Sequence, residues 1–170
     1  MIAPLKDCSA GWCSSVELGS CYEHWYSHEV SHRNSMTTQE LINTSKIIAV
    51  VGISEKPGRP ANDIPQQLFH RGFTIIPVNP MLREWRGIPA YPSVSEIPAH
   101  LSIDIVDIFR KPEAVPEVVR DVLSRTSLPR AIWLQQGITS AEARGLTEQA
   151  GIFFVEDRCL GVEAAFAQRP

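Results

Sequence analysis

Apolar residues in this chain are grouped in short continuous runs, with polar and helical stretches between them. A continuous apolar run of this length predicts a strand that is covered on both faces, because a half-exposed strand would alternate apolar and polar residues. The runs occupy residues 47–53, 73–78, 103–109, 130–137 and 152–157. We therefore expect these five segments to be strands of one sheet.

The regular pattern begins near Met36. Residues 1–35 show neither a sustained helical stripe nor strand alternation, and we expect an irregular or disordered leader there. Met36 is a candidate start of the native chain. Directly after it, Thr37 and Glu40 have the spacing of a capping box, which predicts a short helix through Ser45. The expected division is therefore a leader, 1–35, and a folded domain, 36–170.

A helix is predicted between the first two strands. Asn62 or Asp63 is expected to cap it, because short polar side chains accept hydrogen bonds from the first free N–H groups. Pro65 would then fall in the first turn, where its missing N–H is tolerated, and Gly72 would end the helix. Strand, helix and strand fill about 30 residues, the size of one βαβ unit.

The second half of the chain repeats this alternation. Residues 112–125 read as a helix with its prolines confined to the start. Thr139 and Glu142 form another possible capping box, before a helix that runs to Gly151. Alternation of strands and helices predicts an α/β fold: a Rossmann-like, doubly wound, mostly parallel five-stranded sheet with helices on both faces.

Composition and charge narrow the possible partners. The chain has 170 residues, 44% of them hydrophobic, which is enough for one domain with a core on each side of a sheet. A net charge of −3 gives no overall field to hold a nucleic acid or an anionic membrane surface. The sequence has no apolar run of about 18 residues and no signal-peptide pattern, so we expect a cytoplasmic protein.

The four cysteines do not form a disulfide framework, because three of them lie in the first 21 residues. Cys159, far downstream, is expected to be buried and inert, with a mixed disulfide to a ligand thiol as the alternative. A zinc site in the leader is a second alternative, although its spacing matches no strong zinc signature and we assign no metal. Its ligands would be Cys21, His24, His28 and His32.

The ligand crevice of an open parallel sheet lies outside the carboxyl ends of its strands. The segments that follow the predicted strands contain no Ser/His/Asp set, no usable carboxylate pair and no metal-ligand cluster, so binding is favoured over catalysis. Asp104 and Asp107 are three apart in one strand, hence on opposite faces, and are not expected to act together. The segments are 52–59, 79–80, 109–111, 135–137 and 157–159.

The loop after the first strand has the composition of an anion site. It begins with Gly52 and leads into a helix N-terminus, where free N–H groups and the helix dipole favour a diphosphate. Lys56 and Arg59 would add charged contacts, and Ser54 a hydroxyl donor. One glycine replaces the three of a dinucleotide fingerprint, which weakens the case for NAD.

The residue after the second strand, Asn79, further weakens the case for NAD. An NAD site normally has an Asp or Glu after the second strand to hold the ribose 2′-hydroxyl. With Asn79 there, a ligand that carries a ribose phosphate is favoured, and Arg83 or Arg86 is close enough in sequence to meet the phosphate. Two alternatives stay open: an NAD(P)-binding or redox-sensing domain, and a plain turn at Asn79 and Pro80 with solvated arginines.

Several segments occur in an order and spacing that resemble a known family. They read VVGIS, RPAN, IIPVNP, AYPS, VDIFRKPEAVPEVV, IWLQQGI and VEDRC, and the likeness covers roughly residues 40–163. Together they resemble the small CoA-binding proteins, stand-alone relatives of the CoA-binding domain in the α subunit of succinyl-CoA synthetase. The resemblance implies a Rossmann-like sheet and a ligand that is coenzyme A or an acyl-CoA.

The resemblance also implies where the parts of the ligand bind. The diphosphate would lie near Gly52, Ile53 and Ser54, and the adenosine end near Asn79 and Pro80. Phe109 and Arg110 would line the crevice, and Gln136 and Gly137 would lie beside the pantetheine arm. The cations Lys56, Arg59 and Arg83, expected from the composition of the loops, complete the candidate site.

Two departures limit what the resemblance implies. The family pattern has a Lys and a Glu-His pair after DRC, where this chain has residues 160–164 without them. Ligases of the superfamily also need a phosphorylatable histidine, and no histidine follows His100. We expect non-catalytic binding of a small molecule, and a homodimer or another protein partner stays open.

Overall fold

The computed structural model describes residues 36–167. The expectations for residues 1–35, including the leader and the zinc alternative, lie outside the described residues. The described part contains a five-stranded parallel sheet in the order β2-β1-β5-β6-β7, which confirms the predicted fold class. Its strands are β1 (Ile47–Val51), β2 (Thr74–Val78), β5 (Ile105–Ile108), β6 (Ala131–Leu134) and β7 (Phe153–Val155).

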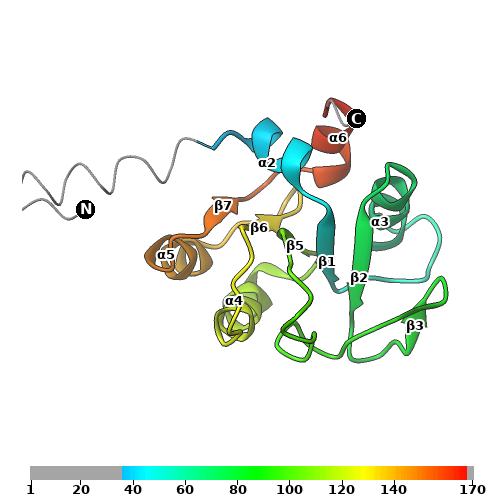
Figure 1. Ribbon diagram of the computed structural model, residues 1–170, viewed down its shortest axis with the longest axis horizontal. Coiled ribbons are helices and arrows are strands. Elements are labelled where there is room, and N and C mark those ends of the chain that lie inside the picture. Colours follow the sequence, from blue (N-terminus) through cyan, green and yellow to red (C-terminus); the bar gives the residue numbers. More distant parts are fainter. Residues whose placement is uncertain (1–35, 168–170) are drawn as a thin grey trace, which may run out of the picture. The chain divides into compact units, whose positions relative to one another are not determined.

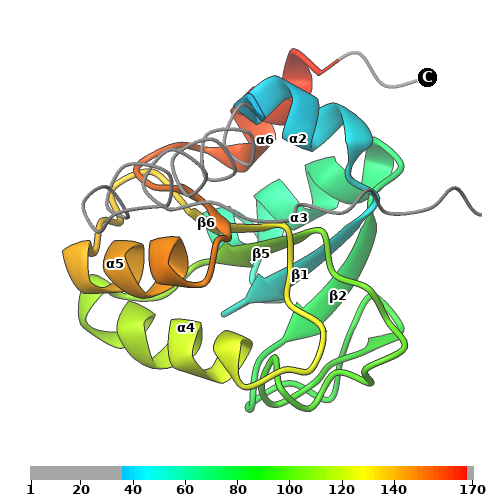
Figure 2. The same ribbon diagram turned by 60° about the vertical axis from the view of Figure 1, so that its left-hand side comes forward.

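Helices cover both faces of the sheet (Figures 1 and 2). One face packs on α4 and α5, and the other on α2, α3 and α6, as the two separate clusters of buried side chains show. No helix within residues 36–167 is both long and apolar enough to span a membrane. The helices are α2 (Thr38–Thr44), α3 (Pro60–His70), α4 (Val115–Leu123), α5 (Ala141–Gln149) and α6 (Leu160–Ala165).

The strands are apolar on both faces because each face is buried under a helix layer. Ala49 and Val51 point to the α4 and α5 side, and Ile48 and Val50 to the α3 and α6 side. Trp133 in β6 is fully buried, and its Nε1–H donates to the carbonyl of Arg158 at 2.6 Å. This bond satisfies the one polar group of the indole and ties the chain after β7 to the sheet.

The first capping box is confirmed. Thr37 Oγ1 accepts from the Glu40 N–H at 3.2 Å, and Glu40 Oε2 accepts from the Thr37 N–H at 2.7 Å. The second was wrong by one residue: Ser140 caps α5, and its hydroxyl accepts from the Ala143 N–H at 3.3 Å. The Ser140 N–H is itself held by the Glu156 carboxylate at 3.1 Å, which fixes that residue as the last non-helical one.

The start of α3 was also predicted too late. Arg59 is the N-cap residue and Pro60 the first helical residue, so Asn62 and Asp63 lie in the first turn rather than at the cap. Pro60 has a backbone angle already suited to a helix start, and this signal outweighs the polar side chains. Pro65 consequently lies inside the helix, not in its first turn.

Four smaller elements were not anticipated. A short antiparallel hairpin follows β2, the predicted helix at residues 112–125 begins with a 3-10 turn, and a helix follows Cys159. The new elements are β3 (Glu84–Trp85), β4 (Ile88–Pro89), η1 (Pro112–Ala114) and α6.

Candidate functional site

The carboxyl ends of β1 and β5 meet at the point where the strand order reverses, because β2 lies on one side of β1 and β5 on the other. Gly52 is at this point with a φ of 84°, and an added Cβ would be 2.6 Å from the Phe109 carbonyl oxygen. Only glycine fits so close an approach at a positive φ. Gly52 thus allows the two loops to touch at the topological switch point.

The loop after Gly52 is anchored on α3 through a helix carbonyl that has no donor within the helix. Pro65 has no N–H to donate to the Ala61 carbonyl four residues earlier. The Ser54 N–H donates to that carbonyl instead, at 3.0 Å. Ser54 Oγ in turn accepts from the Lys56 N–H at 3.2 Å, which folds the loop over the N-terminal end of the helix.

Asn79 joins the first two loops of the site. Its Nδ2 donates to the Ile53 carbonyl at 2.7 Å, and its Oδ1 accepts from the Met81 N–H at 2.9 Å. The backbone N–H of Asn79 donates to the Tyr91 carbonyl at 2.9 Å. Both polar atoms of the Asn79 side chain are therefore bonded to backbone groups. These bonds hold the loops after β1 and β2 together.

Two cavities open at this edge of the sheet. The smaller has a volume of about 270 Å³ and lies between the ends of β1 and β2 and the start of α4. Its walls are mainly apolar, with Arg110 as the cation and Glu117 and Asp121 as the acids. Its lining consists of Val51, Gly52, Val78, Pro80, Pro92, Ser93, Val94, Arg110, Ala114, Glu117, Val118 and Asp121.

The larger cavity has a volume of about 590 Å³ and lies between the N-terminal end of α3, the ends of β5 and β6 and the start of α6. Three cations line it, together with apolar side chains, two glutamines and a half-buried cysteine. Arg110 lines both cavities. The lining consists of Arg59, Pro60, Ala61, Ile64, Phe109, Arg110, Lys111, Pro112, Gln135, Gln136, Ile138 and Cys159.

Half of the twelve residues proposed from the sequence line these cavities, and the other half do not. Gly52 and Pro80 line the smaller one, while Arg59, Phe109 and Gln136 line the larger one. The structure therefore brings the segments after β1, β2, β5 and β6 to one edge, as expected of parallel strands.

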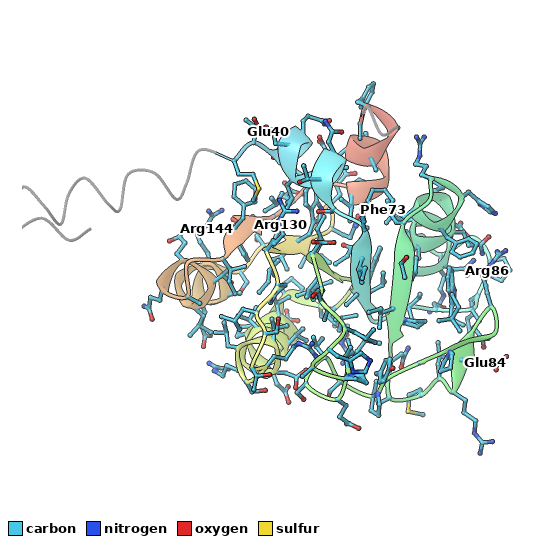
Figure 3. The ribbon with its side chains drawn as sticks, viewed as in Figure 1. Glu40, Phe73, Glu84, Arg86, Arg130 and Arg144 are labelled. Atoms are coloured by element: carbon cyan, nitrogen blue, oxygen red, sulfur yellow. The ribbon has the colours of Figure 1, made fainter. Side chains whose placement is uncertain are left out.

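The remaining residues lie outside the lining of both cavities. Neither of these two cavities is lined by Lys56 or Arg83, and both side chains are exposed. Arg86 stacks 5.6 Å from the Phe69 ring centre and 5.8 Å from that of Trp85, beside α3 (Figure 3). Arg86 is thus occupied away from both cavities, which was not foreseen.

Gly137 has a structural contact of its own. Its N–H donates to Asp157 Oδ1 at 2.7 Å, and its φ is 83°. Ile53 is fully buried and contributes its carbonyl to Asn79. These two residues shape the loops that surround the cavities and do not form cavity walls.

A buried polar pair at the larger cavity was missed. Asp107 is fully buried in β5, and both its carboxylate oxygens accept from Gln135 Nε2, at 2.7 and 2.9 Å. Burial raises the pKa of the Asp107 carboxyl from 3.8 to about 7, while hydrogen bonds from Gln135 and the Ile108 backbone act in the opposite direction. The available signal was an acidic residue inside an apolar strand, IDIVDIF.

Asp104 and Asp107 have separate partners, in agreement with the expectation that they do not pair. The Asp104 carboxylate accepts from the N–H groups of Lys46 and Ile47, at 2.8 and 2.9 Å, at the amino end of β1. Asp104 therefore supports the opposite edge of the sheet, and Asp107 alone belongs to the site.

Comparisons with known proteins identify the family of this chain. The CoA binding domain family matches residues 46–165. The uncharacterized protein YneT of Bacillus subtilis is 37% identical over 127 residues, which are 75% of this chain and 91% of YneT. Acetate–CoA ligase (ADP-forming) I of Archaeoglobus fulgidus is 33% identical over 123 residues, 69% of this chain but only 18% of the ligase.

Solved structures show the same fold. The structure of cell-free ID.343 from Thermus thermophilus is 36% identical, with a TM-score of 0.70 over 76% of this chain and 98% of the other. A hypothetical protein from Pyrococcus horikoshii OT3 is 33% identical, with a TM-score of 0.70 over 77% of this chain and 92% of the other. The chain thus belongs to the family of small CoA-binding proteins, with a domain related to the ADP-forming acetate–CoA ligases.

Proposed function

We propose that this protein binds coenzyme A or an acyl-CoA, without catalysis, at the carboxyl ends of the parallel strands. The observation that carries the proposal is the pair of cavities that share Arg110 as a common wall. A long ligand with a nucleoside at one end and a flexible arm at the other requires two adjoining spaces. A basic residue between them would meet the phosphates that join its two halves.

The chemistry of the two cavities supports one orientation of the ligand. The smaller cavity has apolar walls suited to a flat base, and its carboxylates at Glu117 and Asp121 disfavour phosphates. The larger cavity has Arg59, Arg110 and Lys111 near apolar residues. We therefore assign the nucleoside to the smaller cavity, the phosphates to the three cations and the pantetheine arm to the larger cavity.

Binding without catalysis is the form of the proposal that the residues favour. The ligase from A. fulgidus extends far beyond the part that this chain matches, which is 18% of the ligase. The NAD(P) alternative gains no support, because Asn79 is bonded to backbone groups of Ile53 and Met81.

Cys159 is a free thiol, which suits a reducing compartment, and the cytoplasm stays part of the proposal. A homodimer or another protein partner remains a prediction, testable by light scattering with and without CoA.

Calorimetry and thermal unfolding test the proposal with CoA, acetyl-CoA, NAD and NADP at concentrations up to about 1 mM. We expect binding and stabilisation by CoA or acetyl-CoA. Arg110→Ala should weaken CoA binding by about 1–3 kcal/mol, because it removes a charged contact to phosphate. Arg71→Ala, an exposed arginine at the far end of α3, is the matched control and should bind CoA as the natural chain does. Stabilisation by NAD but not by CoA would refute the proposal.

A further inference from the structure

The buried pair of Asp107 and Gln135 has an unsatisfied atom. Gln135 is only 4% exposed, and its Nε2 is held by both carboxylate oxygens of Asp107. This arrangement fixes the orientation of the amide. Gln135 Oε1 is then buried without a hydrogen-bond partner among the described residues. A buried acceptor that stays unpaired costs about 1–3 kcal/mol, so the pair is short of one donor.

The missing donor has a possible source in the larger cavity. Gln135 belongs to the wall of that cavity, in which we place the amide-bearing arm of the ligand. A secondary amide N–H of the arm can donate the missing hydrogen bond to Gln135 Oε1. The other possible source is internal, because a protonated Asp107 would carry an O–H donor of its own.

These two sources correspond to two orientations of the same amide. With Asp107 ionised, Nε2 faces Asp107 and Oε1 is left as an acceptor. With Asp107 protonated, its O–H can donate to Oε1, so the amide turns over and Nε2 becomes the group without a partner. The two orientations have the same shape, and they differ only in whether Gln135 accepts or donates.

Other titratable groups on the elements around the pair have partners, are exposed or lie at the cavity surface. The neighbouring strand residues of Asp107 are apolar, Val50 in β1 and Trp133 in β6. On the helices over this face, Glu40 of α2 accepts from the Thr37 N–H, Asp63 of α3 accepts from the Gly58 N–H, and Glu163 of α6 pairs with Arg158 at 2.8 Å, while His70 of α3 is exposed. At the cavity itself the titratable groups are Arg59, Arg110, Lys111 and Cys159.

We propose that Asp107 is a positioning residue that sets the hydrogen-bonding polarity of Gln135, so that the ionised carboxylate makes the larger cavity selective for a ligand N–H. The proposal rests on the proposed function, because the arm of CoA supplies the N–H. Ligand binding then favours the ionised form and releases a proton when Asp107 was protonated beforehand. Since burial brings the pKa of Asp107 to about 7, both forms are populated near neutral pH.

Calorimetry with CoA between pH 6 and pH 8 gives the first test. The natural chain should bind CoA up to about tenfold more tightly at pH 8, because only the ionised fraction is competent and a pKa near 7 makes that fraction rise by about that factor. Asp107→Asn should remove this gain and leave only the titration of the ligand's own phosphate. Equal pH profiles for the two proteins would overturn the proposal.

A second pair of variants separates the arm from the nucleotide. Gln135→Leu should weaken CoA binding at least about fivefold at pH 8 and leave binding of 3′-phospho-ADP, which lacks the arm, unchanged. Gln149→Leu, at the exposed end of α5, is the matched control and should not affect either ligand. Loss of both ligands in Gln135→Leu, or of neither, contradicts the proposed contact.

Nuclear magnetic resonance on the ligand-free protein tests the positioning step independently of CoA. The side-chain amide of Gln135 and the carboxyl carbon of Asp107 should titrate together, with one midpoint near pH 7. The Gln135 amide should show no such step in Asp107→Asn. An amide signal that is constant from pH 5.5 to 8.5 would refute the proposal even if CoA binds. A clear step without CoA binding would refute the proposed function while confirming the amide switch.

Discussion

Two buried polar side chains of this protein differ in how completely they are satisfied. Arg125 is 8% exposed and donates to the carbonyls of Val94 and Ile97 at 2.8 and 2.6 Å, and to those of Leu101 and Ser127 at 3.3 Å each. Gln135 is 4% exposed and keeps one oxygen without a partner. Arg125 thus completes the structure of the loop before β5, whereas Gln135 Oε1 has no donor among the described residues.

The difference distinguishes a polar side chain that is buried to support the fold from one that is buried at a ligand site. A buried polar group with all its partners rigidifies the chain around it, while a partly satisfied one marks a place where strain is tolerated for another reason. Arg125 lies away from the lining of both cavities, and Gln135 belongs to the wall of the larger one. Substitutions at the two sites should therefore affect different properties.

The largest expected effect is on stability at Arg125. Arg125→Met keeps much of the side-chain length but leaves several carbonyls without a donor, so it should lower the free energy of unfolding by about 2–4 kcal/mol. Urea unfolding measures this change. Arg120→Met, an exposed arginine on α4, is the control and should change stability by less than about 1 kcal/mol. Equal effects of the two variants would show that Arg125 is not the structural centre of its loop.

A smaller effect is expected from the pH dependence of stability at Asp107. Its folded pKa of about 7 lies above the ordinary 3.8, so the folded state binds more protons than the unfolded state between these values. The contribution of Asp107 to the free energy of unfolding is therefore fully present below pH 3.8, and it is lost as the pH rises through about 7. Between pH 5 and pH 8 the natural chain should lose about 2–3 kcal/mol through this group.

Asp107→Asn should remove that loss, and thermal unfolding at pH 5, 6.5 and 8 measures it. The variant is expected to gain stability relative to the natural chain as pH rises. A parallel decline of both proteins would show that Asp107 is ionised in the folded state over the whole range, and it would also remove the basis of the amide switch.

The smallest effect on stability is expected at Asn43, a second side chain with an unpaired acceptor that can be compared with Gln135. Asn43 Oδ1 is also buried without a partner among the described residues, but Asn43 is in α2, outside the lining of both cavities. Asn43→Ala should be neutral or stabilise the protein by up to about 1 kcal/mol, because it removes an unpaired acceptor and improves helix propensity. CoA affinity should not change. A loss of CoA affinity would mean that a position in the cavity wall is not what distinguishes Gln135 from Asn43.

Much of the fold was predictable because strong local signals agreed with each other. The apolar runs fixed the five strands and the capping box at Thr37 fixed the start of α2. The start of α3 was misjudged, because Pro60 and the polar residues after it gave competing signals. The two-residue strands β3 and β4 are too short to show a period in sequence.

The site was predictable to the level of segments but not of side chains. Parallel topology alone places the residues after the strands at one edge, which accounts for Gly52, Pro80 and Arg110 at the cavities. The roles of Asn79 and Arg86 depend on contacts with distant residues, Ile53 and Phe69, that no local pattern encodes. The Asp107 pair was missed for the same reason, since its partner is 28 residues away.

A crystal structure with CoA bound tests the central claim most directly. We predict continuous ligand density from the smaller to the larger cavity past Arg110, with an amide N–H of the arm within hydrogen-bonding distance of Gln135 Oε1. Density for CoA at another surface, or no density at this edge of the sheet under saturating CoA, would contradict the account.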